Sequence, residues 1–244
     1  MNIIRNDKLI KRNSRIATIS MIGGLVILGA GMVISFRYAD QFGISLAALM
    51  AGFILSQVGI YYSNRWGRRP RPDELIDQAL KGMDSKYTLY HYLTPAAHVL
   101  LGPAGIWVLM PYYQRGTITY TKGRWRQRGG NWYLKIFAQE NLGRPDLEVA
   151  AEVENLQSYL VKRSSGEVLP DIQSVMVFTH PKTTVEVSEE EEPPIPAVTL
   201  AKLKDFIRKS AKGKSLSIEK IKVIQDALSV LPAPDENTDK QKET

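Results

Sequence analysis

The sequence predicts a two-helix transmembrane hairpin, then an α/β domain with a mixed sheet, and last a short pair of C-terminal helices. Three observations support this fold class. Two long uncharged apolar segments lie near the N-terminus, short strand-like runs punctuated by glycine and proline fill the middle, and helical apolar periodicity returns toward the end. The 244 residues leave room for one domain of roughly 150 residues beside such an anchor.

The hairpin is expected at residues 16–64. Ile16 to Phe36 gives 21 residues without a charge, and Gln41 to Asn64 gives another 24. Each run can cross about 30 Å of hydrocarbon at about 1.5 Å per residue. Only residues 37–40 separate the two runs, and four residues can form no more than a tight turn. A cleaved signal peptide is disfavoured because the first run is too long and a second follows at once.

Basic residues flank both outer ends of the hairpin. They are Arg5, Lys8, Lys11, Arg12 and Arg15 in the basic N-terminus (residues 1–15), and Arg65, Arg68, Arg69 and Arg71 after the second span. Since such residues stay on the cytoplasmic side, the chain is expected in the cell (inner) membrane with both termini cytoplasmic. The part after Asn64 holds 26 positive and 23 negative residues, so most of the net charge of +7 lies beside the bilayer.

Small residues recur at four-residue spacing on the second span, at Ala48, Gly52 and Ser56. Such a stripe permits close helix packing, either within the hairpin, which is the favoured interpretation, or against other membrane proteins. Neither span contains an ionisable residue, so the hairpin is expected to anchor the chain rather than to transport ions.

An α/β domain is expected over residues 65–188. A short amphipathic helix should begin near Asp73, and Pro145 suits the first position of another helix. Five strands are expected between these helices as an antiparallel meander, and two more follow the second helix. The predicted strands are Tyr87–Leu93, Ala97–Leu101, Ile106–Met110, Thr117–Thr121, Gly123–Gln127, Val175–Thr179 and Thr183–Val187.

The remaining segments follow from composition and periodicity. Residues 189–198 read as an acidic, proline-rich linker, and residues 232–244 as a disordered tail. The C-terminal helices are expected over residues 199–231, with Thr199 and Ser217 as N-caps.

The segment Ala97-His98-Val99-Leu100-Leu101-Gly102-Pro103-Ala104-Gly105-Ile106-Trp107-Val108-Leu109 resembles the nuclease-related domain family, NERD. The resemblance runs over roughly residues 73–187, through Gly116-Thr117-Ile118, Trp125 and Val175-Met176-Val177-Phe178-Thr179-His180-Pro181. It implies a restriction-endonuclease-like fold. It also implies an Asp-His sequence at the start of the strand that ends at Leu101. A Glu-x-Lys sequence is implied at the end of the strand that begins at Ile106. In such nucleases the carboxylates hold Mg²⁺ and the lysine stabilises charge.

The implied catalytic positions are occupied by Ala97, Met110 and Tyr112. None of these side chains supplies a carboxylate or an ammonium group. The chain is therefore expected to be a pseudoenzyme without a metal or another cofactor, and Glu74 and His98 are expected to be structural. The alternative is a nuclease with relocated ligands, for example Asp84 or Glu140.

Basic and aromatic residues are densest in residues 122–135, where the candidate binding residues are Lys122, Arg124, Arg126, Arg128 and Lys135. On a strand the three arginines would share one face while Trp125 points into the core. That face is either a solvated surface or a site for nucleic acid or anionic lipid headgroups. A second basic region, Lys202 to Lys214, is expected to be solvated, and His91 and His180 are expected to be structural.

The absent motifs exclude several enzyme classes. The chain has no cysteine, no phosphate-binding Gly-Lys-Ser/Thr loop and no dinucleotide glycine fingerprint. The sequence thus predicts a membrane-anchored pseudonuclease that binds or scaffolds, with the bilayer as its partner and either nucleic acid or anionic lipid headgroups as candidate ligands. The alternatives are a subunit of a membrane complex that involves no nucleic acid, and the nuclease with relocated residues.

Overall fold

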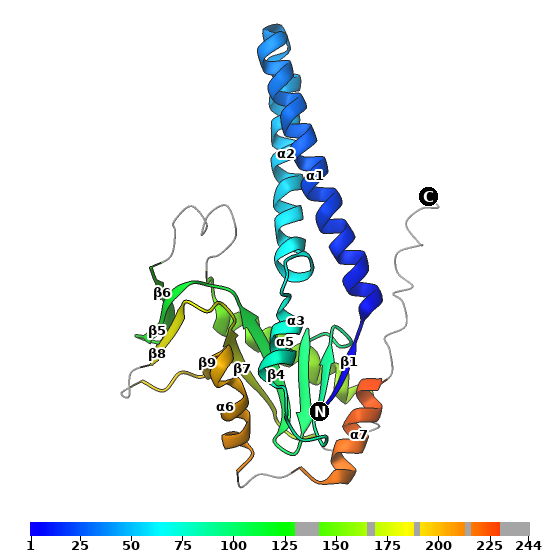
Figure 1. The fold of residues 1–244 in the computed structure, drawn as a ribbon, viewed down its shortest axis with the longest axis vertical. Helices are drawn as coiled ribbons and strands as arrows, with labels where there is room; N and C mark the ends of the chain where they lie inside the picture. The colour runs from blue at the N-terminus through cyan, green and yellow to red at the C-terminus, as the bar shows by residue number, and fades with distance from the viewer. Residues whose placement is uncertain (130–141, 165–168, 188–190, 213–215, 230–244) are drawn as a thin grey trace. The chain divides into compact units, whose positions relative to one another are not determined.

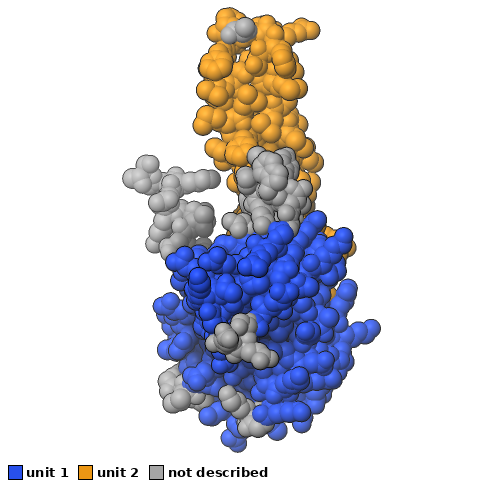
Figure 2. Space-filling view, turned by 90° about the vertical axis from the view of Figure 1, so that its left-hand side faces the viewer, with its two compact units in different colours: residues 1–6, 75–130, 141–244 blue, residues 7–74, 131–140 orange. Residues whose placement is uncertain are grey.

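The computed structural model describes residues 1–129, 142–164, 169–187, 191–212 and 216–229, and Figure 1 traces their elements. The described residues form two compact units, coloured separately in Figure 2. One unit comprises residues 7–74, and the other comprises residues 1–6 together with those from residue 75 onward.

The unit of residues 7–74 is a helical hairpin. Helix α1 (Asp7–Arg37) and helix α2 (Phe42–Tyr62) are joined by the short turn η1 (Ala39–Gln41), and the π-helical turn η2 (Ser63–Gly67) follows α2. Both helices are long and apolar enough to cross a membrane, and 17% of each apolar stretch is buried within the protein. The prediction of two membrane-length apolar helices is confirmed, and the turn lies where it was expected.

Small residues bring the two helices into close contact. A Cβ atom added at Gly52 would lie 2.8 Å from the backbone nitrogen of Leu28, and one at Gly31 would lie 3.1 Å from Ala48 Cβ. Ser45 donates a hydrogen bond of 2.9 Å to the Gly31 carbonyl. The stripe of Ala48, Gly52 and Ser56 therefore faces α1, which confirms the favoured use within the hairpin. Contact with other membrane proteins through these residues stays a prediction.

The other unit, blue in Figure 2, is built on two mixed sheets. Strands β1 (Asn2–Arg5), β2 (Thr88–His91), β3 (His98–Gly102), β4 (Gly105–Tyr112), β7 (Ile172–Phe178) and β9 (Ala197–Thr199) form the larger one, in that order. The pairs β2–β3 and β3–β4 are antiparallel, and the other pairs are parallel. The smaller sheet has β5 (Gly116–Thr121) between antiparallel β6 (Arg124–Arg128) and parallel β8 (Thr183–Val187).

Two apolar cores cover the two faces of the larger sheet. Along β4, Val108 and Met110 belong to a core with α5 (Pro145–Val161) and α7 (Ile218–Ser229), whereas Leu109 belongs to a second core. That second core contains residues of α3 (Pro72–Ala79) and α6 (Leu203–Ser210). Since successive side chains of a strand point to opposite faces, helices sandwich this sheet and its central strands are apolar on both sides.

The prediction of one antiparallel meander is wrong. Strands β2, β3 and β4 form a meander, but β5 and β6 belong to the other sheet, and β4 pairs with β7 instead of β5. The physical reason is that Tyr112 ends β4 and the next strand begins only at Gly116, whose φ of +95° redirects the chain. Alternation of apolar residues identifies strands without identifying their partners.

Two strands were missed because each lies in a segment assigned another role. Residues 2–5 of the expected basic flank form β1, whose register with β2 pairs Ile4 with Tyr90. The expected linker ends in β9, which pairs with β7, and Ile195 packs against the core. Neither segment has the alternation of a half-buried strand, because both strands are short edges of the sheet.

Several predicted helix signals are confirmed. Pro145 occupies the first turn of α5, and its Val149, Leu156 and Leu160 are fully buried. The Ser217 hydroxyl accepts a hydrogen bond of 3.3 Å from the Lys220 amide at the start of α7. Thr199 precedes a short 3-10 turn and makes no capping hydrogen bond with its side chain. Predictions for Lys135, Glu140, residues 230–231 and the tail lie outside the described residues.

Candidate functional site

The positions implied by the nuclease resemblance lie at the start of β3 and the end of β4. The Ala97 carbonyl accepts a hydrogen bond from the Tyr92 amide, and Met110 is packed in the core with α5. The Tyr112 hydroxyl donates a hydrogen bond of 3.1 Å to Glu148 on α5, and its ring centroid lies 5.7 Å from that of Phe178. Met110 and Tyr112 are thus packed in the core, and the Tyr112 hydroxyl acts as a hydrogen-bond donor there.

Potential metal ligands are not gathered in the described part of the chain. Within those residues no three histidine, aspartate or glutamate side chains stand close enough to hold a metal ion. Asp84, one suggested relocated ligand, accepts a hydrogen bond of 3.0 Å from the Lys86 amide, and this bond holds the pKa of the carboxyl below its usual value. It stabilises a surface turn.

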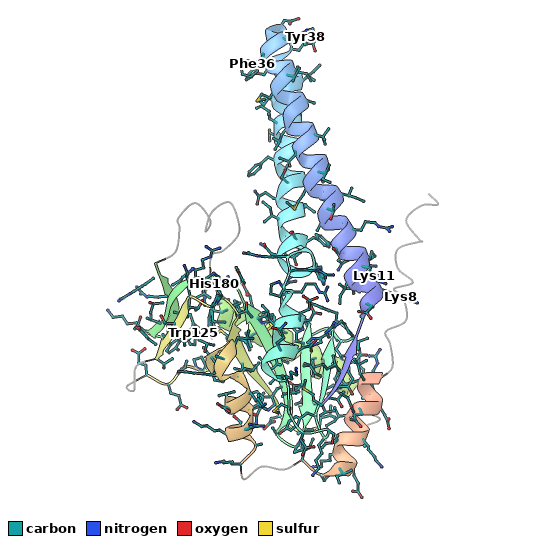
Figure 3. All side chains as sticks on the ribbon, in the orientation of Figure 1. Lys8, Lys11, Phe36, Tyr38, Trp125 and His180 are labelled. Carbon is teal, nitrogen blue, oxygen red and sulfur yellow. The ribbon has the colours of Figure 1, made fainter. Side chains whose placement is uncertain are left out.

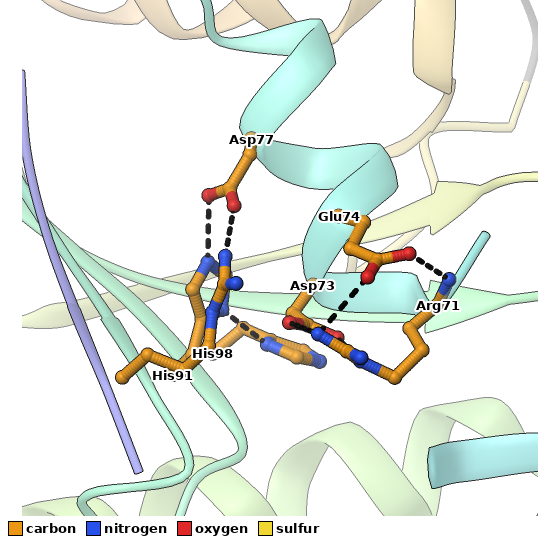
Figure 4. Close-up of polar contacts among 7 residues, drawn as sticks. Arg71, Asp73, Glu74, Asp77, His91 and His98 are labelled. Carbon is orange, nitrogen blue, oxygen red and sulfur yellow. Dashed lines mark hydrogen bonds and ion pairs between the residues drawn. The ribbon is translucent and has the colours of Figure 1, made fainter. Parts of the chain in front are cut away.

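A buried polar chain joins four elements of the unit that contains the sheets, as Figure 4 shows. The Nδ1 atoms of His91 on β2 and His98 on β3 lie 2.7 Å apart, and His91 Nε2 lies 3.0 Å from Asp77 on α3. Asp77 also pairs with Arg5 on β1. Since an ionised carboxylate only accepts hydrogen bonds, His91 donates from Nε2 to Asp77, and one of the two facing Nδ1 atoms donates to the other.

Sequence reasoning missed this histidine pair, because seven residues separate the two positions along the chain. The usable signal was the β2–β3 hairpin, whose register places His91 directly opposite His98. His91 is fully buried and His98 is 2% exposed. Through Asp77, the pair links β1 and α3 to the β2–β3 hairpin in the interior of this unit. Tyr92 beside it has a φ of +59°, a left-handed conformation that is rare for a tyrosine.

Glu74 belongs to a separate cluster in the unit of residues 7–74, drawn in the same close-up (Figure 4). Arg71 Nε lies 3.0 Å from Asp73 and Arg71 Nη2 lies 3.1 Å from Glu74. The Arg71 amide also donates to the Glu74 carboxylate, so Glu74 satisfies a backbone donor at the start of α3. Arg71 was predicted as one of the basic residues that follow the second span, and the structure pairs it with two carboxylates.

The smaller sheet presents a basic outer face, which we call the arginine face. It comprises Arg124, Arg126 and Arg128 of β6, Thr117, Thr119 and Thr121 of β5, and Thr184 and Glu186 of β8. The three arginines are exposed, while Trp125 is 7% exposed and its ring lies 5.1 Å from that of Tyr120 in the core. Figure 3 labels Trp125 on this sheet. The predicted sidedness of this strand is confirmed.

The arginine face carries polar groups that are not used within the described protein. No hydrogen bond or ion pair joins the three guanidinium groups to another described residue. Thr119 lies between Arg126 and Glu186 in the register, is 8% exposed, and its hydroxyl has no partner in the described part of the chain. Lys122 sits at the exposed tip of the β5–β6 turn with a φ of +53°.

The other predicted basic and histidine sites have ordinary structural surroundings. On α6, Lys204 donates to the Lys81 carbonyl, Ile207 is buried, and the Phe206 ring lies 5.5 Å from that of Trp107. His180 Nδ1 accepts a hydrogen bond of 3.0 Å from the Lys182 amide.

No family model, curated protein or solved structure matches this chain. The geometry of its own residues is therefore the basis for a functional proposal. Two properties matter most, namely the packed end of β4 and the arginine face, whose guanidinium groups pair with no residue in the described part of the chain.

Proposed function

We propose that this protein is a membrane-anchored pseudonuclease, whose NERD-like domain binds single-stranded nucleic acid at the cytoplasmic side of the inner membrane. The observation that carries the proposal is the arginine face. Three exposed guanidinium groups repeat at every second residue of β6, about 7 Å apart. Threonine hydroxyl groups lie beside them on the neighbouring strand.

Membrane anchoring is supported by where the apolar side chains of the hairpin point. Large residues along both helices are exposed in this unit, among them Leu25 at 65%, Val26 at 64% and Ile54 at 60%. A contiguous surface of this kind is unfavourable in water and favourable in hydrocarbon. The basic residues at the two outer ends of the hairpin support a cytoplasmic location for both termini.

A binding role is favoured over catalysis by the contents of the β4 end. Met110 and Tyr112 occupy positions where the family resemblance implies a glutamate and a lysine, and both side chains are buried against apolar neighbours. A Mg²⁺ ion needs hard oxygen ligands, which methionine and alanine do not provide. The domain thus retains a surface suited to a polyanion and lacks the implied centre for cleaving one.

The test uses the full chain in nanodiscs of zwitterionic phosphatidylcholine, because residues 1–6 form a strand of the domain. Fluorescence anisotropy measures binding of labelled single-stranded DNA and RNA at several salt concentrations, with and without Mg²⁺. We expect Arg124→Ala/Arg126→Ala/Arg128→Ala to weaken binding by more than about tenfold. The matched control, Lys202→Ala/Arg208→Ala/Lys209→Ala, changes the residue just before α6 and two residues on it. It removes the same charge and should weaken binding by less than about threefold.

Two results would contradict the proposal in different ways. If the wild-type protein does not bind at low salt, the domain is an interaction subunit of a membrane complex instead. If Mg²⁺ produces cleavage that survives repurification, the chain is an enzyme with relocated ligands.

A further inference from the structure

We infer that the open end of the hairpin carries a site for the phosphate group of an anionic lipid, with Arg65 as its central ligand. The site is formed by residues 8–15 of α1 and by residues 61–69 of α2, η2 and the segment that follows. The inference rests on the proposed membrane anchoring, and it concerns a different unit from the arginine face.

The Arg65 guanidinium is held in place by aromatic side chains. Its Nη1 donates a hydrogen bond of 2.9 Å to the Tyr61 hydroxyl, and its Cζ lies 5.2 Å from the centre of the Tyr61 ring and 5.9 Å from that of Trp66. A guanidinium has five N–H donors, so most of them stay available on this exposed side chain. A planar group fixed in this way suits two-point binding of a phosphate.

The π-helical turn that contains Arg65 packs against α1. Its defining hydrogen bond runs from the Arg68 amide to the Ser63 carbonyl at 2.8 Å. A Cβ atom added at Gly67 would lie 3.7 Å from Ala17 Cβ, so η2 packs against α1 near Arg15. Turns of this type occur frequently at functional sites.

The charges at this end of the hairpin are mostly positive, although Asp7 stands in the first turn of α1. Residues 8–15 contribute four basic side chains and residues 65–69 contribute three, and neither segment contains an acidic residue. Among the described residues, Lys11, Arg15 and Arg69 form no ion pair with a carboxylate. Figure 3 labels Lys8 and Lys11 at this end and Phe36 and Tyr38 at the other, where Asp40 accompanies Arg37.

The arrangement fits a lipid better than a soluble anion because the basic groups adjoin apolar surface directly. Val58 is 38% exposed and Tyr61 is 44% exposed, and Arg65 follows within two helical turns. Tyrosine and tryptophan favour the boundary between hydrocarbon and headgroups, so Tyr61 and Trp66 place Arg65 at the level of the lipid phosphates. Anionic lipids of the cytoplasmic leaflet supply that phosphate together with a net negative charge.

The experiment uses Trp66 as a local probe in the full chain. The protein is reconstituted in phosphatidylcholine vesicles with a fixed fraction of brominated lipid, either phosphatidylglycerol or phosphatidylcholine, with bromine near the glycerol end of the chain. Because bromine quenches tryptophan on contact, the difference between wild type and Trp66→Phe isolates the Trp66 signal. We expect brominated phosphatidylglycerol to be enriched around Trp66 by about threefold or more over brominated phosphatidylcholine.

Variants separate the site from general attraction to the membrane. Arg65→Gln should abolish the preference for the anionic lipid while quenching by brominated phosphatidylcholine persists, and Arg37→Gln at the other end should change neither. Equal quenching of wild type by the two lipids, or an unchanged preference in Arg65→Gln, overturns the lipid site and leaves the anchor intact. Absence of Trp66 quenching by either lipid overturns the membrane anchor itself.

Discussion

Strands β4 and β6 belong to the same unit and use their two faces in opposite ways. Both faces of β4 are covered, so Ile106 to Met110 alternate between two apolar cores. Strand β6 has one covered face, occupied by Trp125, and one open face with three arginines. A strand that is buried on both faces cannot accommodate charged side chains without a large desolvation cost. A strand with one solvent-exposed face can present charged side chains to a ligand at little cost to folding.

The largest expected effect compares one substitution on the two strands. Met110→Glu would bury a carboxylate without a partner and should lower the free energy of unfolding by about 4 kcal/mol. Arg126→Glu on the open face should change it by less than about 0.5 kcal/mol. Thermal unfolding of the full chain in detergent measures both, and the first should lower Tm by roughly 8 to 16 °C. A wild-type Tm for Met110→Glu would mean that the end of β4 is open to water.

A second comparison stays within β6. Trp125→Ala removes a large side chain from the core and should lower the free energy of unfolding by about 3 kcal/mol. Arg124→Ala, its exposed neighbour, should lower it by less than about 0.5 kcal/mol. Denaturant titration of both variants beside wild type measures the difference. Similar losses for the two variants would contradict the assignment of one buried and one open face.

Periodicity alone predicted the features that depend on neighbouring residues in the chain. The two long apolar helices, the helix beginning at Pro145 and the opposite sides of Trp125 and Arg126 follow from local spacing. The partners of β4 and the contact between His91 and His98 depend on how strands pair, which apolar alternation does not encode. The same limit applies to Arg71. The sequence shows that this residue is basic, but it does not show that the side chain pairs with Asp73.

Because Tyr90 on β2 is buried in the larger sheet, the free energy of unfolding should depend on pH in the alkaline range. Burial, assisted by the nearby Asp226 carboxylate, raises the pKa of Tyr90 to about 12. The folded state therefore holds this proton more tightly than the unfolded state, whose tyrosine pKa is about 10. The resulting stabilisation, at most about 3 kcal/mol, is complete below pH 10 and is lost as the pH rises through 12. Tyr90→Phe should reduce this alkaline loss in unfolding titrations, and an unchanged loss would contradict it.

The smallest effect concerns the hydroxyl at the end of β4. Tyr112→Phe removes the hydrogen bond to Glu148 and keeps the ring beside Phe178. We expect a loss of about 1 kcal/mol in the free energy of unfolding and no change in binding of nucleic acid. Weaker binding by the folded Tyr112→Phe protein would show that the β4 end still contacts the ligand.

The salt dependence of oligonucleotide binding tests the role of the arginine face most directly. In phosphatidylcholine nanodiscs, the slope of log K against log salt concentration is measured for wild type and for Arg124→Ala/Arg126→Ala/Arg128→Ala. Loss of three phosphate contacts to a single strand should reduce the magnitude of the slope by about 2. Equal slopes for the two proteins would contradict the proposal and place the phosphate contacts elsewhere on the molecule.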